Sequence, residues 1–319
     1  MVQNTRTTAA APKGSALVAF LFFTLFVAGA PVAIRMTYAE LAPFSMAALR
    51  FGLAALILWG IVLYKHIPLP RGRALAGALL YGALTVGLAF LFINWGLVAT
   101  PAGRASILMS TVPLMSVFLS ALHGVERITR RGLLGASLAL AGIALTAANP
   151  AAGQSSLPHM AALLVGAALS AEGGVLVKRF PPSPVIMTNA IAVTVGGAIL
   201  GVASLAAGEA WIIPVQARTW AALAYLVIPL SVGAFLLYLH VVHAWSATGA
   251  SYGFVVSPLV TIVAASVLAG EEIAPKFLAG AVLVLAGAVV GALLPARATP
   301  APPPDPCYDA EGRLIPDCA

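Results

Sequence analysis

Long runs of apolar residues, separated by short polar breaks, fill almost the whole chain of 319 residues. Most are close to the ~20 residues that an α-helix needs to cross the hydrocarbon core of a bilayer. The runs lack the short alternating pattern of barrel strands, and a helix satisfies its own backbone polar groups in lipid. The pattern therefore predicts ten membrane-spanning helices, at residues 16–34, 43–63, 75–98, 106–122, 133–148, 160–177, 185–207, 221–242, 251–268 and 277–294.

The composition excludes a soluble protein. Only 17 basic and 10 acidic residues occur, so 8% of the chain is charged, and the mean hydropathy is +1.00. About a quarter of the residues of a soluble domain are charged, and this chain has too little polar surface to cover itself in water. The two cysteines, Cys307 and Cys318, both lie in the polar C-terminal tail. We therefore expect neither a disulfide between helices nor a metal cluster built from cysteines.

Lysine and arginine positions predict the orientation of the chain in the membrane. With the N-terminus inside, the cytoplasmic segments hold twelve basic residues and the outer loops hold four, while Arg50 falls inside the second span. This bias follows the positive-inside rule and predicts that both termini are cytoplasmic. The four outer basic residues are Arg35, Arg104, Arg218 and Lys276. Because the basic residues stand in ones to threes beside apolar runs, the net charge of +7 does not indicate nucleic-acid binding.

The chain also repeats itself. Ala105 and Ser106 recur as Ala250 and Ser251, and the same offset (250 − 105 = 145) continues without a gap over 39 positions, 13 of them identical. The matched pairs include Pro113 with Pro258, Glu126 with Glu271, and Gly135 with Gly280. Apolar composition alone does not place prolines and glutamates in register. The repeat therefore indicates two tandem units, each with five spans.

An odd number of spans in each unit predicts the architecture, because the second unit must enter the membrane upside down. The predicted fold class is an all-α polytopic membrane protein, with ten transmembrane helices arranged as two inverted five-helix repeats. The predicted segments are a cytoplasmic N-terminal tail (1–15), a first repeat (16–148), a linker loop (149–157), a second repeat (158–294) and a Pro-rich, disordered cytoplasmic tail (295–319).

The motifs and their order resemble the EamA-type, ten-span permeases of the drug/metabolite transporter (DMT) superfamily. The resemblance is carried by PFSMAALRF at 43–51, by the motif from Ala105 through Pro113 to Glu126 with its repeat at 250–271, and by the G-x-x-L-x-L-A-G runs that begin at Gly135 and Gly280. It covers residues 16–294 and implies that the first four helices of each half surround a central cavity. The fifth and tenth helices are then peripheral.

Two charged residues are expected within the spans. Glu172 lies some five residues from the end of the sixth span. A carboxylate inside the membrane is costly, so we interpret it as a proton carrier or a partner for a substrate amine, or else as a group that snorkels or pairs with a nearby basic residue. Arg50, about two turns into the second span, either meets an anionic substrate group or has a structural role, by snorkelling or by binding helix-end carbonyls.

Neutral polar and aromatic residues near the two prolines complete the predicted substrate cavity. They suit a small zwitterion or a ring-bearing metabolite, although serines also serve helix packing in membranes. With Glu172 and His243 they are Asn94, Trp95, Ser106, Ser110, Trp245, Tyr252 and Ser257. His240 and His243 share a face of the eighth span but lack two further ligands nearby, so we expect cavity or interfacial histidines and no metal site.

Four other residues have expected structural or hinge roles. Pro113 and Pro258 each free a backbone carbonyl in mid-helix and, as equivalents in the repeat, predict a kink or hinge. Glu126 and Glu271 lie at helix ends, where capping or ion pairing explains them.

These patterns predict a secondary transporter that moves a small organic metabolite across a bacterial-type inner membrane. The resemblance implies an amino acid, an amino-acid-like metabolite or a drug-like analogue, export, and alternating access. No phosphate-cradling motif is present, and we expect no enzyme activity and no cofactor. Energy would come from the substrate gradient or from protons carried by Glu172. The expected partners are the lipid bilayer and, through Gly287-x-x-x-Gly291 of the tenth span, a second copy of the chain.

Two alternatives stay open. A sugar-phosphate or nucleotide-sugar exchanger needs several basic residues in its cavity, and only Arg50 lies within a span. An intramembrane lipid-modifying enzyme needs paired catalytic groups, but no aspartate precedes Asp305 and no His-Glu-x-x-His motif occurs.

Overall fold

The computed structural model describes residues 14–123, 130–147, 156–177, 179–181, 183–234, 237, 241, 247–270 and 275–290. Within this part of the chain the regular elements are all helices. They are α1 (Gly14–Thr37), α2 (Pro43–Tyr64), α3 (Arg73–Tyr81), η1 (Gly82–Leu88), α4 (Ala89–Val98), α5 (Ala102–Met109), α6 (Val112–Leu122), α7 (Arg130–Ala147), α8 (Leu157–Val177), α9 (Val185–Ala206), α10 (Ala217–Tyr225), η3 (Leu226–Ala234), α12 (Ala247–Ala269) and α13 (Pro275–Ala288).

These helices confirm the predicted all-α membrane fold. Each predicted span contains at least one observed helix, and six helices in the described part are long and apolar enough to cross a membrane. The third span is one continuous run made of α3, η1 and α4, while the described part of the eighth span consists of α10 and η3. Apolar run lengths therefore predict the number and order of the spans well, because crossing a bilayer fixes the length of a helix.

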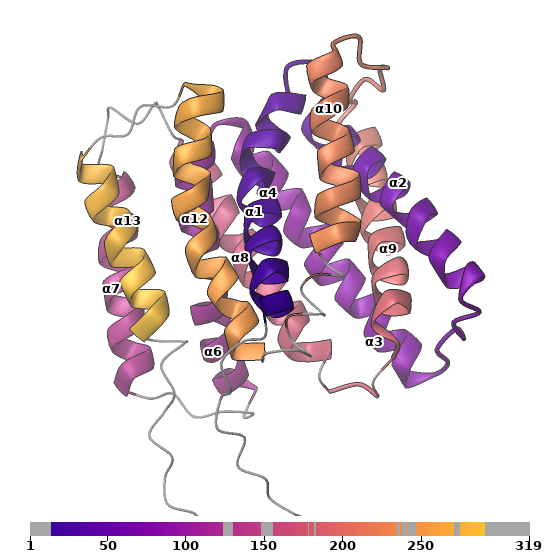
Figure 1. Ribbon diagram of the computed structural model, residues 1–319, viewed down its shortest axis with the longest axis horizontal. Helices are drawn as coiled ribbons and strands as arrows, with labels where there is room; N and C mark the ends of the chain where they lie inside the picture. The colour runs from indigo at the N-terminus through magenta and orange to yellow at the C-terminus, as the bar shows by residue number, and fades with distance from the viewer. Residues whose placement is uncertain are drawn as a thin grey trace, which may run out of the picture.

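The two halves pack against each other across the middle of the bundle. Helix α2 of the first half lies along α9 of the second, η1 contacts both α8 and α9, and α4 lies against α8. Helices α7 and α13 pack mainly against each other and stand together at one edge, on the left of Figure 1. This is the peripheral position that the family resemblance implies for the fifth and tenth spans.

Both halves contain a π-helical stretch at equivalent places, which hydropathy does not predict. Segments α3 and α10 begin 144 residues apart, and η1 and η3 follow them at the same offset (217 − 73 = 226 − 82 = 144). A π-helical turn holds one residue more than an α-turn and is frequent at functional sites. In η3, the Ser231 hydroxyl donates a hydrogen bond of 2.8 Å to the carbonyl of Leu226, five residues earlier.

The fourth span is interrupted where the sequence predicts a kink at Pro113. Helix α5 ends at Met109 and α6 begins at Val112, with Pro113 in the first turn of α6. The Ser110 and Thr111 hydroxyls donate to the carbonyls of Ile107 and Leu108, at 2.7 and 2.6 Å. In the second repeat Pro258 lies inside α12, which continues without a break. The two prolines therefore occupy equivalent positions but different local structures.

Arg104 lies within a helix, whereas the sequence predicts that it belongs to an outer loop. Helix α5 begins at Ala102, four residues before the predicted span, and its Arg104 side chain is only 2% exposed. Arg104 is therefore a buried charged residue of the bundle, as Arg50 is. Length and hydropathy missed it because an arginine three residues after Pro101 is typical of a loop.

Close packing of α7 and α13 depends on glycine. A Cβ atom on Gly142 would lie 2.6 Å from the carbonyl oxygen of Gly280, and one on Gly287 would lie 2.5 Å from that of Gly135. Gly287 therefore faces α7 of the same chain, whereas Gly291 lies outside the described residues. Dimerisation through the tenth span stays a prediction.

We predict that Gly142→Ala and Gly287→Ala each lower the stability of the detergent-solubilised protein by about 1–3 kcal/mol, the usual cost of overpacking. The neighbouring atoms belong to backbone and cannot move away as a flexible side chain can. Thermal unfolding followed by size-exclusion chromatography measures the effect. Gly52→Ala is the matched control, because no atom lies within 4 Å of its new methyl group. Equal behaviour of all three variants contradicts the prediction.

Candidate functional site

A cavity of about 370 Å³ lies between the two halves, near the middle of the helices. We name it the central cavity. The first half contributes α1, α2, η1 and the ends of α3 and α4, and the second half contributes α9 and η3. Its lining residues are Phe23, Val27, Arg50, Phe51, Tyr81, Thr85, Val86, Phe90, Asn189, Val193, Leu230, Ser231 and Ala234. Both π-helical stretches take part, so the widened turns border the cavity in each half.

Among the described residues, Arg50 is the one charged residue in the lining of the central cavity. Its side chain is 4% exposed, and its Nε donates a hydrogen bond of 3.1 Å to the Ser231 hydroxyl of the opposite half. The guanidinium carbon lies 4.7 Å from the ring centroid of Phe51 and 5.3 Å from that of Phe90. These distances are within the range of cation–π attraction. Two aromatic rings and a hydroxyl thus hold the guanidinium beside the cavity.

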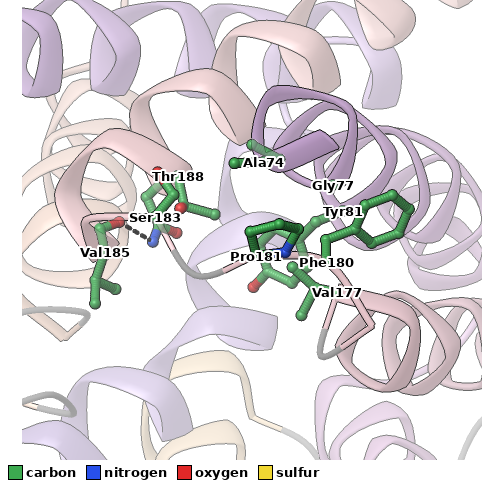
Figure 2. Close-up of a pocket in the computed structure, with 11 residues that line it drawn as sticks. Ala74, Gly77, Tyr81, Val177, Phe180, Pro181, Ser183, Val185 and Thr188 are labelled. Carbon is green, nitrogen blue, oxygen red and sulfur yellow. Dashed lines mark hydrogen bonds between the residues drawn. The ribbon is translucent and has the colours of Figure 1, made fainter. Parts of the chain in front are cut away.

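A second cavity, of about 470 Å³, adjoins the central one. It lies where α8 ends and α9 begins, against the first turns of α3 (Figure 2). We name this end of the bundle the Phe180 end. Tyr81 and Asn189 line both cavities. The Asn189 amide donates to the carbonyl of Val185 at 2.9 Å, which fixes the side chain where the cavities meet.

The opposite end of the bundle is held together by two carboxylates that cross between the halves. Glu209, after α9, accepts hydrogen bonds from the amides of Phe44 and Ser45 in the first turn of α2, at 3.1 and 2.7 Å. The first amides of a helix have no partner within it, and a negative charge there is favoured by the helix dipole. Glu209 therefore caps a helix of the other half.

Glu40, after α1, makes the reciprocal contact. It accepts from the amides of Val215 and Gln216, at 2.8 and 3.1 Å, and from the Thr219 hydroxyl at 2.5 Å, at the start of α10. The Thr219 hydroxyl and the Val215 amide lower the pKa of Glu40, because they stabilise the charged carboxylate. We call the two caps the cross-half clamp and this end, at the top of Figure 1 where α10 begins, the Glu40 end.

Further contacts close the first half at the Glu40 end. Arg35 donates to the carbonyls of Leu97 and Thr100, at 3.1 and 2.5 Å, and thereby ties α1 to the end of α4. The Tyr38 hydroxyl donates to the backbone carbonyl and the side-chain oxygen of Asn94, at 2.9 and 3.0 Å. The Glu40 end is therefore closed by polar contacts, while the Phe180 end borders a cavity.

Glu172 lies outside the lining of both cavities and pairs with a residue that the sequence analysis did not consider. Its Oε1 is 2.6 Å from Nε2 of His123, at the end of α6. Arg179 donates to the backbone carbonyl of His123 at 2.5 Å. Glu172 is therefore in contact with a histidine, and its role as a proton carrier or as a structural group stays a prediction. The two side chains are 22% and 23% exposed.

The other predicted cavity residues make contacts within the bundle or face outward. Asn94 is fully buried and donates to the Phe90 carbonyl at 2.7 Å, whereas Trp95 is 40% exposed and stacks on His159 at 4.5 Å between ring centroids. Ser106 donates to the Thr261 hydroxyl at 3.1 Å. Thr261 donates to the Ala28 carbonyl at 2.7 Å, so this contact joins α5, α12 and α1.

Ser110 bonds the backbone of its own helix, as described above, and Ser257 is buried in α12. Tyr252 also belongs to α12. Glu126, His240, His243, Trp245 and Glu271 lie outside the described residues. Among the described residues no group of three or more His, Cys, Asp and Glu side chains could hold a metal ion.

Comparison with known proteins identifies the class. A family model for EamA-like transporters matches residues 14–148 and 158–292, one match for each half. Together with two five-span halves around a shared cavity, this match defines a polytopic membrane transporter of the drug/metabolite type, not an enzyme. The chain belongs to the EamA-like transporter family.

Individual relatives agree with this assignment. The uncharacterized inner membrane transporter YedA of Escherichia coli (strain K12) is 30% identical over 282 residues, which cover 84% of this chain and 89% of the relative. A probable terminal-alkyne amino-acid exporter of Streptantibioticus cattleyicolor is 28% identical over 233 residues, covering 69% and 74%. A crystal structure with 19% identity matches at a TM-score of 0.64, over 88% of this chain and 98% of that one, which concerns the fold alone.

Proposed function

We propose that the protein exports a small, amino-acid-like organic metabolite across the inner membrane by alternating access of its two halves. The observation that carries this proposal is the central cavity, which both halves line and which adjoins a second cavity at the Phe180 end. In an inverted-repeat transporter the substrate site lies near the midplane between the repeats. Because the cross-half clamp closes the Glu40 end, this arrangement fits a state of the transporter that takes up its substrate from the Phe180 end.

The direction of transport is supported by the distribution of basic residues. The positive-inside rule assigns the loops at the Phe180 end, which contain Lys65, Arg71 and Arg179, to the cytoplasm. A cavity that adjoins the cytoplasmic end can take up a metabolite made in the cell. The amino-acid exporter among the relatives supports the same direction and substrate class. A reporter fused after residue 294 should report a cytoplasmic C-terminus.

Transport by the purified protein in liposomes tests this function. We expect saturable counterflow of at least one radiolabelled apolar amino acid or amino-acid analogue, and none in empty liposomes. Absence of saturable exchange across such a panel contradicts the proposal.

A cavity-filling variant gives a sharper prediction. Asn189→Trp places an indole where the two cavities meet, and we expect it to lower counterflow at least about tenfold because the substrate path is filled. Val202→Trp is the matched control, since Val202 lies on the same helix, α9, and is 67% exposed on its outer face. Equal rates for the two variants, at equal folded yield, contradict the path through the cavities.

A further inference from the structure

Among the described residues, Arg50 is a buried cation without an acidic partner. Of the acidic residues before the C-terminal tail, Glu172 is the one that lies within a span, and it pairs with His123. Glu40 and Glu209 cap helices at the Glu40 end, and Glu126, Glu271 and Glu272 belong to loops by sequence. A buried charge is strongly unfavourable when nothing of opposite sign is beside it. The bundle thus leaves the countercharge of Arg50 to another molecule.

The geometry leaves the terminal nitrogens of Arg50 available to that molecule. Nε is used by Ser231, whose own hydroxyl donates to Leu226, so the hydroxyl accepts from Arg50 and fixes its orientation. In the described structure the two Nη groups have no hydrogen-bond partner, and the side chain lines the central cavity. Four N–H bonds in a planar fork match the two oxygens of one carboxylate.

Among the described residues that line the central cavity, no carboxylate is present to pair with an ammonium group. The other polar residues of the lining are neutral: Tyr81, Thr85, Asn189 and Ser231. The remaining lining is aliphatic or aromatic, including Phe23, Phe51 and Phe90. An amino acid bound here has its carboxylate paired and its side chain in apolar surroundings, but its amino group meets only neutral groups.

We infer that the central cavity selects its substrate by a carboxylate that binds Arg50, and that an apolar body is required while an amino group is not. The substrate class is therefore that of small monocarboxylates with an apolar or aromatic body, amino acids included. This inference rests on the proposed function and specifies the chemistry of its site. Cations and neutral amides of the same shape are poor ligands.

Four compounds that share one phenyl-containing body test the inference: L-phenylalanine, 3-phenylpropanoate, phenylalaninamide and phenethylamine. We expect the two carboxylates to stabilise the purified wild-type protein against thermal unfolding and to compete in counterflow with similar potency. The amide and the amine should be at least about tenfold weaker, because hydrogen bonds to a charged partner contribute roughly 1.5–3 kcal/mol and 1.4 kcal/mol corresponds to tenfold in affinity.

Arg50→Gln removes the charge and should bring the carboxylate-to-amide affinity ratio close to one. Arg50→Lys keeps the charge without the planar fork and should give an intermediate ratio. This variant tests the inference even if the glutamine variant does not fold. Lys65→Gln, an exposed basic residue just after the same helix, is the matched control and should leave the ratio unchanged. The ratio is insensitive to a general loss of folded protein.

The outcomes separate the two proposals. Wild-type transport of the amine or amide as efficient as that of the carboxylates, or an unchanged ratio in Arg50→Gln and Arg50→Lys, overturns the inference and leaves the transport function standing. Failure of the wild-type protein to exchange any compound of the panel overturns the proposed function itself.

Discussion

Removing the cross-half clamp is expected to open the Glu40 end of the bundle. In the double variant Glu40→Ala/Glu209→Ala, two helix N-termini lose their caps, and no side chain of α2 or α10 replaces them. A cysteine introduced at Val27, which lines the central cavity, should then react faster with a membrane-impermeant thiol reagent added at that end. The two natural cysteines, Cys307 and Cys318, are replaced by serine beforehand.

The size of the expected increase in labelling rate follows from the hydrogen bonds that are lost. Glu209 accepts two backbone hydrogen bonds, and removing charge-assisted bonds of this kind costs about 1.5–3 kcal/mol. A shift of 1.4 kcal/mol between closed and open states changes the open population about tenfold when that state is rare. Glu209→Ala alone should therefore raise the labelling rate at least about tenfold, and the double variant should raise it further.

Side-specific controls decide the interpretation. Reagent added from the Phe180 end should label Val27→Cys more slowly in the double variant, because one end opens at the expense of the other. Glu40→Gln/Glu209→Gln keeps an accepting oxygen at each position and should have a smaller effect. An unchanged rate at the Glu40 end, or a rise at both ends, shows that the clamp does not hold that end closed.

Lowering the pH at the Glu40 end should also weaken the cross-half clamp. The pKa of Glu40 is lowered in the folded protein, so its caps are present at neutral pH and are lost as the pH falls through that lowered pKa. Hydrogen exchange at the Val215 and Gln216 amides, corrected for its intrinsic pH dependence, measures this loss. Glu40→Gln should exchange at these amides at a rate that no longer responds to acid.

The membrane fold could be predicted from the sequence because its causes are local. Each span needs a minimum apolar length, and a repeat of five spans forces the inverted arrangement whatever the side-chain packing. The π-helical stretches could not be predicted in this way. Residues 82–88 and 226–234 contain no charged side chain, and hydropathy carries no information about the number of residues per turn.

The predicted cavity residues stay a prediction, because residue type alone does not say which way a side chain points. Asn94 and Ser106 are polar, but Asn94 donates to the Phe90 carbonyl of its own helix and Ser106 donates to Thr261 of α12, so both are used in holding the bundle together. Phe90 and Val193 line the cavity although nothing in the sequence separates them from lipid-facing residues. In the sequence, Glu40 and Glu209 cannot be distinguished from other acidic residues in loops. Only the fold brings each of them to a helix of the other half.

Replacing Glu172 by glutamine is expected to abolish the response to a pH gradient and to leave substrate counterflow intact. The Glu172–His123 pair, 2.6 Å apart, joins α8 to α6, and it is the described acid–base pair at the Phe180 end. The residue after Glu172 is Gly173, which packs against the Thr85 hydroxyl of η1 so closely that a Cβ atom would not fit between them. Thr85 in turn lines the central cavity. A change at Glu172 therefore reaches the cavity wall through one tightly packed contact between α8 and η1.

If a proton on this pair drives the cycle, an imposed pH gradient should accelerate wild-type transport in liposomes and should not accelerate Glu172→Gln. Counterflow needs no net proton movement and should stay within about twofold of wild type. His123→Gln should behave in the same way, because either side chain alone lacks its partner, whereas Lys65→Gln, an exposed residue just after α2, should keep the gradient response. Loss of both activities in Glu172→Gln means that the residue is structural. Retention of both assigns the driving force to the substrate gradient, since Glu172 is the one carboxylate that the sequence places inside a span.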